Sequence, residues 1–114
     1  MPDCLFCKIV AKQIPAKLAY EDDEMVAIHD INPQAPLHIL LIPQKHISRI
    51  TDIAESDLDL LGHLIFRAKR IVEEKKMAEP GFRLVFNSGA DGGQTVFHIH
   101  LHLLAGRHMG WPPG

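Results

Sequence analysis

The stretch His98-Ile99-His100-Leu101-His102 places three imidazoles at alternate positions, and it decides the fold expected for this chain. Side chains alternate between the two faces of a β-strand, so a strand here puts all three histidines on one face, roughly 6–7 Å apart. The opposite face can pack on a core, because it carries Phe97, Ile99, Leu101 and Leu103. This spacing lets several imidazoles surround one anion or metal ion, and imidazole can act as nucleophile, acid or base near neutral pH.

A glycine-rich segment, residues 88–93, leads into this histidine run. Glycines let backbone N–H groups converge on an anion, and Asn87, Gln94 and Thr95 can add side-chain donors. Many such segments are only tight turns, so its pairing with three histidines is what indicates a site for an anion such as phosphate. A catalytic zinc ion held by the three histidines is the alternative, although the turn offers no obvious partner for a metal-bound water.

Composition bounds the class of protein. The chain has 114 residues, 46% of them hydrophobic, and a formal net charge of −2, which predicts one domain over residues 1–114. We expect no nucleic-acid or membrane partner, since the sequence has no basic run and no apolar stretch long enough to span a bilayer. A cytoplasmic location is the default expectation, and a reducing compartment disfavours a disulfide between Cys4 and Cys7.

Hydrophobic periodicity predicts an α+β domain. We expect a short helix over residues 5–13 and a long helix over residues 56–77. The apolar stripe expected on the long helix consists of Leu58, Leu61, Ile65, Ala68 and Val72. Runs rich in β-prone residues predict strands over residues 18–20, 25–30, 38–43, 82–87 and 95–104. The last two strands would form an antiparallel hairpin across the glycine-rich turn.

Cys4 and Cys7 form a Cys-x-x-Cys pair for which three interpretations stay open. The spacing suits two metal ligands, which histidines could complete. It also occurs in thioredoxin-like redox sites, although these accompany a βαβ pattern that is not found here. The thiols could equally pack under the sheet as small apolar groups. Asp30 is open too, since a carboxylate at a strand end could accept from vicinal sugar hydroxyls or cap the next loop.

Segment 93–104 resembles the histidine-triad motif, His-x-His-x-His followed by apolar residues. Nearly all of the chain is similar to the nucleotide-binding (Hint) branch of the histidine triad (HIT) family, through segments 14–17, 21–23, 29–36, 42–47 and 106–114. The resemblance implies a HIT-like α+β fold, an antiparallel sheet of about five strands with one long and one short helix. It also implies a homodimer in which the two subunits join their sheets.

The resemblance implies hydrolysis of purine nucleoside phosphoramidates, such as adenosine 5′-monophosphoramidate, and of lysyl-adenylate. His100 corresponds to the family's nucleophile, which forms a nucleotidyl-histidine intermediate that water releases as the monophosphate. A backbone carbonyl near His98 would fix the tautomer of His100. His38 would support the triad, and Thr95 would also protonate the leaving amine. The other nucleotide-binding positions implied are His102, Asn87, Gln94 and Thr95 at the phosphate, Gly93 in the turn, Asp30 at the ribose, His29 and Ile31 at the purine, and Trp111 at the partner subunit's site.

Some family members with an N-terminal Cys-x-x-Cys bind a structural zinc ion, which implies the ligands Cys4, Cys7, His46 and His98. Other members lack these cysteines, so the resemblance implies no cofactor for catalysis. The expected ligand is AMP, GMP or a phosphoramidate. Two further functions stay open. One is hydrolysis of dinucleoside polyphosphates, whose branch lacks the Trp-Pro-Pro-Gly ending of residues 111–114. The other is a non-catalytic, nucleotide-binding regulator.

Overall fold

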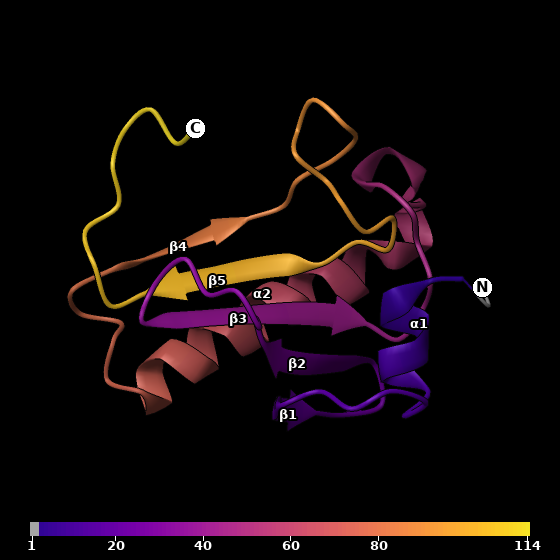
Figure 1. The fold of residues 1–114 in the computed structure, drawn as a ribbon, viewed down its shortest axis with the longest axis horizontal. Helices are drawn as coiled ribbons and strands as arrows, with labels where there is room; N and C mark the ends of the chain where they lie inside the picture. The colour runs from indigo at the N-terminus through magenta and orange to yellow at the C-terminus, as the bar shows by residue number, and fades with distance from the viewer. Residues whose placement is uncertain (1–2) are drawn as a thin grey trace.

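The computed structural model describes residues 3–114, and its centre is one five-stranded antiparallel sheet (Figure 1). The strand order is β1-β2-β3-β5-β4. The strands are β1 (Leu18–Glu21), β2 (Met25–His29), β3 (Leu37–Pro43), β4 (Phe82–Val85) and β5 (Leu101–Ala105), and the helices are α1 (Leu5–Val10) and α2 (Leu58–Glu74). The predicted α+β class, with about five antiparallel strands and one long helix, is confirmed.

The two helices lie against opposite faces of the sheet (Figure 1). Every residue of β3 is buried, because this strand is central and covered on both sides. Odd-numbered residues of β3, such as Ile39 and Leu41, pack with α2, while Leu40 and Ile42 pack with Phe6 and Ile9 around α1. Alternation along the strands therefore builds two apolar layers, and the histidine side chains of β3 and β5 share the α1 face.

The histidine strand is shorter than predicted, since β5 begins at Leu101 and residues 95–100 are not in a strand. The last paired residues of β3 and β5 are Leu41 and Leu101. Beyond them stands Pro43, which has no N–H to continue the ladder, and its carbonyl accepts from the imidazole Nε2 of His98 at 2.7 Å instead. The predicted strand over residues 95–104 is therefore wrong for residues 95–100. The rings of His98 and His100 still both contact Phe6 on the α1 face, although His98 has different polar partners from His102.

The buried face of α2 also differs from the predicted stripe. The residues that pack inward are Leu60, Leu64, Ala68, Ile71 and Val72. Leu58 and Ile65 are instead 59% and 48% exposed. Helical spacing allows two apolar stripes on this helix, and the one that continues into Ile71 and Val72 faces the sheet. None of the described helices is long and apolar enough to cross a membrane.

Candidate functional site

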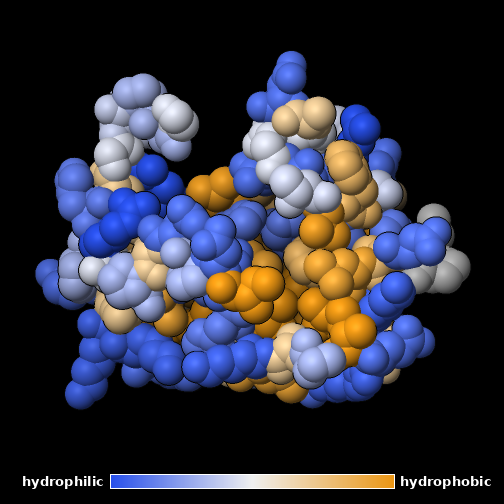
Figure 2. All heavy atoms as spheres, viewed as in Figure 1, coloured by the Kyte–Doolittle hydropathy of each residue, from blue (hydrophilic) through white to orange (hydrophobic). Residues whose placement is uncertain are grey.

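A cavity of about 380 Å³ opens on the α1 face, and it brings the histidine segment together with the ends of β2 and β3. Apolar side chains gather on this face of the molecule (Figure 2). Its apolar walls include Leu5, Phe6, Ile9, Ile14, Ile28, Ile31, Leu40 and Val96, and its polar groups include Lys17, His29, Asp30, Thr95, His100 and His102. The cavity therefore combines apolar walls with hydroxyl, carboxylate and imidazole groups, as suits a small ligand with a flat apolar part and a polar part.

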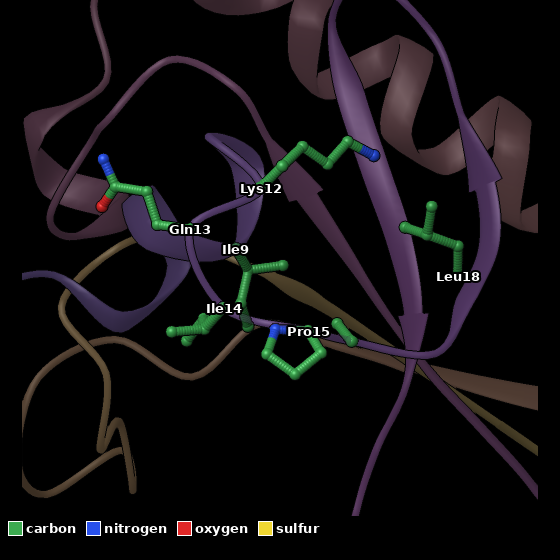
Figure 3. A pocket seen from close by; sticks show the side chains of 7 residues that line it. Ile9, Lys12, Gln13, Ile14, Pro15 and Leu18 are labelled. Carbon is green, nitrogen blue, oxygen red and sulfur yellow. The ribbon is translucent and has the colours of Figure 1, made fainter.

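A second hollow, of about 390 Å³, shares Ile9, Ile14, Pro15 and Ala16 with this cavity. Figure 3 shows the side chains that line this second hollow. Lys12 lines it, and its ammonium lies 2.6 Å from the Glu21 carboxylate. No histidine lines this hollow, so the groups that can perform chemistry belong to the first cavity.

His100 is buried and has one nitrogen fixed by the backbone. Its Nδ1 lies 2.8 Å from the carbonyl oxygen of His98, so Nδ1 carries the proton and donates. Burial lowers the pKa of His100, and the bond to that carbonyl opposes the shift only in part. The ring of Phe6 packs edge-on at 4.8 Å between centroids. The neutral imidazole therefore keeps a lone pair on Nε2 in the cavity, which is the state a nucleophile requires.

His102 and His38 form a hydrogen-bonded pair of neutral imidazoles. His38 Nε2 lies 2.9 Å from His102 Nδ1 and 3.5 Å from the Asp30 carboxylate. Burial lowers the pKa of His102 to about 4 and also lowers the pKa of His38. Asp30 accepts from the backbone N–H of Asn32 through its other oxygen. Both possibilities raised for Asp30 thus find support in the geometry, since it caps the loop and still lines the cavity.

His98 faces away from the cavity, toward the N-terminal cysteines. Its Nε2 donates to the carbonyl of Pro43, so its Nδ1 carries the lone pair. That Nδ1 lies 3.5 Å from both Cys4 Sγ and Cys7 Sγ and 3.1 Å from His46 Nδ1. Burial lowers the pKa of His98 to about 4, which keeps the ring neutral at pH 7.

These four side chains fit a tetrahedral metal ion. All four ligand atoms lie within 4.8 Å of one another, and zinc bonds of about 2.0–2.3 Å place neighbouring ligand atoms roughly 3.3–3.8 Å apart. The Cys₂His₂ donor set is typical of structural zinc. The bond of His98 to Pro43 is also the outer-shell contact that orients a metal-binding histidine. Among the three interpretations of the cysteine pair, the geometry favours two metal ligands.

Asp30, His38 and His102 form another cluster of ligand-type atoms, but its protonation does not suit a metal. The backbone N–H of Gln34 donates to His38 Nδ1 at 3.0 Å, which leaves the proton of this neutral ring on Nε2. Nε2 is the atom that faces both Asp30 and His102. A protonated nitrogen cannot bind a metal ion, so this cluster is a hydrogen-bonded network.

The remaining predicted residues fall into two groups. Thr95, His29 and Ile31 line the cavity, whereas Asn87, Gly93, Gln94 and Trp111 do not. Gln94 is buried, its Nε2 donates to the carbonyls of Ser48 and Val96, and its Oε1 accepts from the N–H of Gly89. Both hydrogens of its amide are therefore used to close the glycine-rich loop. Trp111 is 85% exposed at the chain's end.

Sequence reasoning missed several groups at the site. Phe6 and Ile9 of α1 form much of the apolar wall, and their spacing of three on a short amphipathic helix was the signal that could have found them. The carbonyl of Pro43 and the N–H of Gln34 orient histidine rings. No sequence signal marks these two groups, because every residue has a carbonyl and all but proline have an N–H.

Residues 3–111 match the family model described as "Scavenger mRNA decapping enzyme C-term binding". A HIT-like protein of Synechocystis is 49% identical over 98% of this chain and 97% of its own length. The 14 kDa zinc-binding protein of Brassica juncea is 46% identical over 98% of this chain and all of its own. Adenylylsulfatase HINT1 of Arabidopsis thaliana is also 46% identical, over 96% of this chain and 76% of that protein.

Solved structures agree with these sequence matches. The HIT family hydrolase of Legionella pneumophila superposes with a TM-score of 0.97 at 52% identity, over 98% of this chain and all of that one. A zinc-bound histidine triad family protein of Mycobacterium smegmatis superposes with a TM-score of 0.80 at 33% identity, over 99% and 81% of the two chains. The motif, the fold and these similarities lead to one conclusion: the chain belongs to the histidine triad family.

Proposed function

We propose that this chain is a purine nucleoside phosphoramidase of the Hint branch, which hydrolyses adenosine 5′-monophosphoramidate and aminoacyl-adenylate substrates to AMP. The observation that carries the proposal is the state of His100, whose Nδ1–H is bound to a carbonyl while Nε2 keeps its lone pair in a cavity of nucleotide size. The 46% identity to a protein named HINT1 supports the branch. The hydrolase named among the solved structures supports the class of reaction.

The cavity suits a purine nucleotide along its length. The base would lie among the apolar side chains between His29 and Ile31 on one side and α1 on the other. Asp30 has one carboxylate oxygen bound to the Asn32 N–H, so its other oxygen can accept from the ribose hydroxyls. The α-phosphate would then reach the histidine end, where AMP, GMP or a phosphoramidate meets His100, His102 and Thr95.

The reaction divides into two displacements. His100 Nε2 attacks the α-phosphorus and forms a P–N bond to the imidazole, while the bond from phosphorus to the leaving amine breaks. The amine takes up a proton from the Thr95 hydroxyl, and His102 donates to a phosphoryl oxygen as negative charge develops. Water then attacks the phosphorus while the P–Nε2 bond breaks, which returns one proton to the Thr95 oxygen, restores the lone pair of His100 Nε2 and releases AMP. Asn87 and the turn at Gly93 do not line the cavity, so they would complete the phosphate site by moving toward the bound phosphate.

Turnover with and without the nucleophile tests the proposal. We would incubate the protein and His100→Ala with adenosine 5′-monophosphoramidate in excess chelator and follow AMP release. We expect the wild type to release AMP, and His100→Ala to lose at least 10³-fold in kcat, because no other imidazole replaces its Nε2. His108→Ala, an exposed histidine outside the cavity, is the matched control. Retained turnover in His100→Ala would contradict the nucleophile assignment.

The relative named adenylylsulfatase supports a second substrate for the same site, adenylyl sulfate, in which sulfate replaces the amine as leaving group. A side-by-side measurement of kcat/KM on the phosphoramidate, adenylyl sulfate and a diadenosine polyphosphate separates the three. We expect the phosphoramidate to be preferred. A preference for the dinucleotide would assign the chain to the other hydrolase branch, and binding without turnover of any substrate would indicate a nucleotide-binding regulator.

A structural zinc ion and a homodimer complete the proposal. Cys4, Cys7, His46 and His98 would hold the zinc, which fixes the position of the loop before β5 and leaves His100 free to react. Names of relatives that include zinc support the identity of the metal. The homodimer has support in exposed apolar side chains on α2, namely Ile65 and Phe66, and in the free edge of β4. The partner's site would then be within reach of exposed Trp111.

A further inference from the structure

We infer that the backbone N–H of Gln34 decides which nitrogen of His102 donates into the cavity, so that Gln34 is a positioning residue for the reaction. The expected effect of Gln34 on turnover rests on the proposed function, whereas its effect on the tautomer of His102 does not. It concerns a series of hydrogen bonds through three groups, Gln34 N–H, His38 and His102, which starts in the loop before β3 and ends at the cavity.

The first step of this chain is the bond to His38. The N–H of Gln34 can only donate, and it lies 3.0 Å from His38 Nδ1. Nδ1 must therefore be the unprotonated nitrogen, so the proton of the neutral ring is on Nε2. Burial of the His38 side chain, which is 4% exposed, keeps water from competing for either nitrogen.

The second step passes this choice to His102. His38 Nε2–H lies 2.9 Å from His102 Nδ1, so His102 must accept there and keeps its own proton on Nε2. If His38 carried its proton on Nδ1, its Nε2 lone pair would instead favour a proton on His102 Nδ1. The Nε2 of His102 would then present a lone pair, which repels phosphoryl oxygens.

Asp30 favours the same arrangement. Its carboxylate oxygen lies 3.5 Å from His38 Nε2, and the Asp30 N–H donates to the His38 carbonyl. The carboxylate that would receive the ribose hydroxyls is thus in contact with the imidazole that orients His102. These contacts place the ribose end and the phosphate end of the cavity in one hydrogen-bonded network.

Proline at position 34 removes the donor N–H, while the carbonyl at this position can still accept from Arg107. The bond from the Gln34 side chain to the Asn32 carbonyl is lost equally in an alanine variant. We would compare Gln34→Pro with Gln34→Ala, which keeps the N–H. Long-range ¹H–¹⁵N spectra of the imidazoles report the tautomers directly. We expect His38 and His102 to be protonated on Nε2 in the wild type and Gln34→Ala, and to shift toward mixed tautomers in Gln34→Pro.

The kinetic readout is kcat for adenosine 5′-monophosphoramidate. Removing one preorganised donor to a transition state costs about 10²–10³ in kcat, so partial loss of the correct tautomer should place Gln34→Pro at least tenfold below Gln34→Ala, with KM changed less. When His38 is replaced by Gln, the side-chain amide of the new residue can donate to His102 with or without the N–H at position 34. Adding Gln34→Pro to the His38→Gln variant should therefore leave kcat unchanged.

Two results would overturn the inference: a wild-type His102 protonated on Nδ1, or equal spectra and equal kcat for Gln34→Pro and Gln34→Ala. If Gln34→Pro does not fold, the wild-type spectrum still tests the tautomer of His102. The kcat values of His38→Gln and His38→Leu then test the donor, because only Gln keeps a donor toward His102. Equal kcat for that pair would also overturn it. Absence of wild-type turnover would contradict the proposed function while the spectra still test the tautomer.

Discussion

The three histidines of the motif present different ring nitrogens because a different neighbour holds each ring. His98 donates from Nε2 to the Pro43 carbonyl, His100 donates from Nδ1 to the His98 carbonyl, and His102 accepts at Nδ1 from His38. His98 thus offers a lone pair to the cysteines, His100 offers one to the cavity, and His102 offers a proton. Under the proposed function, these three arrangements suit His98 to metal binding, His100 to nucleophilic attack and His102 to hydrogen-bond donation.

Buried neutral imidazoles make stability depend on pH. The pKa of His102 is about 4 in the folded chain and near 6.5 when unfolded, so the unfolded state binds more protons between these values. Stability is therefore complete above pH 6.5 and falls as the pH drops toward 4. Urea unfolding in excess chelator at pH 7 and pH 4.5 should differ by up to about 2.5 kcal/mol from this residue alone.

His102→Gln is the control for this pH dependence, since an amide does not titrate. It should reduce the change in unfolding free energy between pH 7 and pH 4.5 by the share of His102, while the share of His98, whose pKa is also lowered to about 4, remains. Asp22 and Asp57 have pKa values lowered below 3.8, so the stability they contribute is lost only at lower pH. An unchanged slope in His102→Gln would contradict the assignment of His102 as a buried neutral group.

The residue types at the site were visible in the sequence, but their partners were not. The alternating histidines, Asp30 and the Cys-x-x-Cys pair could be selected by residue type and spacing. Gln94 shows the limit, because an amide beside a glycine-rich turn predicts a donor to phosphate, while its hydrogens are bound to carbonyls 46 and 2 residues away. Long-range backbone contacts of this kind have no local pattern.

At the scale of elements, the ladder of β3 and β5 has a close contact at the end where Leu37 pairs with Ala105. Gly106 follows β5 with φ of +98°, and a Cβ there would lie 2.8 Å from the Cβ of Pro36. Gly106→Ala should lower the free energy of unfolding by about 2–3 kcal/mol, from left-handed strain and the clash. Urea denaturation measures the change.

Gly62→Ala is the matched control for that substitution. Gly62 lies within α2, and an added Cβ has no atom within 4 Å. Alanine has the higher helix propensity, so this variant should gain about 0.5–1 kcal/mol. Opposite signs for the two glycine substitutions are the expected result, and a loss at both positions would contradict the local explanation given for Gly106.

Elements were predictable where a local pattern sets them, and less so where a distant residue does. The buried run of β3 and the position of the long helix followed from hydrophobic periodicity. The start of β5 did not, because it depends on Pro43, which lies 58 residues before Leu101 and stops the ladder. The choice between two apolar stripes on α2 likewise depends on packing against the sheet rather than on the helix.

At the scale of the whole molecule, the Cys–His cluster joins α1 to the loop after β3 and to the segment before β5. We expect the purified protein to contain one zinc per chain, measured by plasma mass spectrometry. Cys7→Ser should lose most of it and unfold at a lower temperature, because metal binding stabilises only the folded chain. Stoichiometric zinc in Cys7→Ser would contradict this ligand set.

The assembly is tested by mass in solution. We expect sedimentation at twice the 12.8 kDa chain mass. Phe66 is 54% exposed on α2, and Phe66→Glu should shift the protein toward the monomer, because a charge is costly in an apolar interface. Leu58→Glu, in the first turn of the same helix, is the control expected to stay dimeric. A wild-type monomer would contradict the homodimer.

The division of roles among the histidines has a consequence for how this sequence can vary. The Pro43 and His98 carbonyls and the Gln34 N–H belong to the main chain, so substituting the side chain at position 34 leaves the donated hydrogen in place. A saturation scan of that position should tolerate nearly every amino acid and reject proline. Residues that assign chemistry in this way would look interchangeable in an alignment, although the group each contributes is fixed.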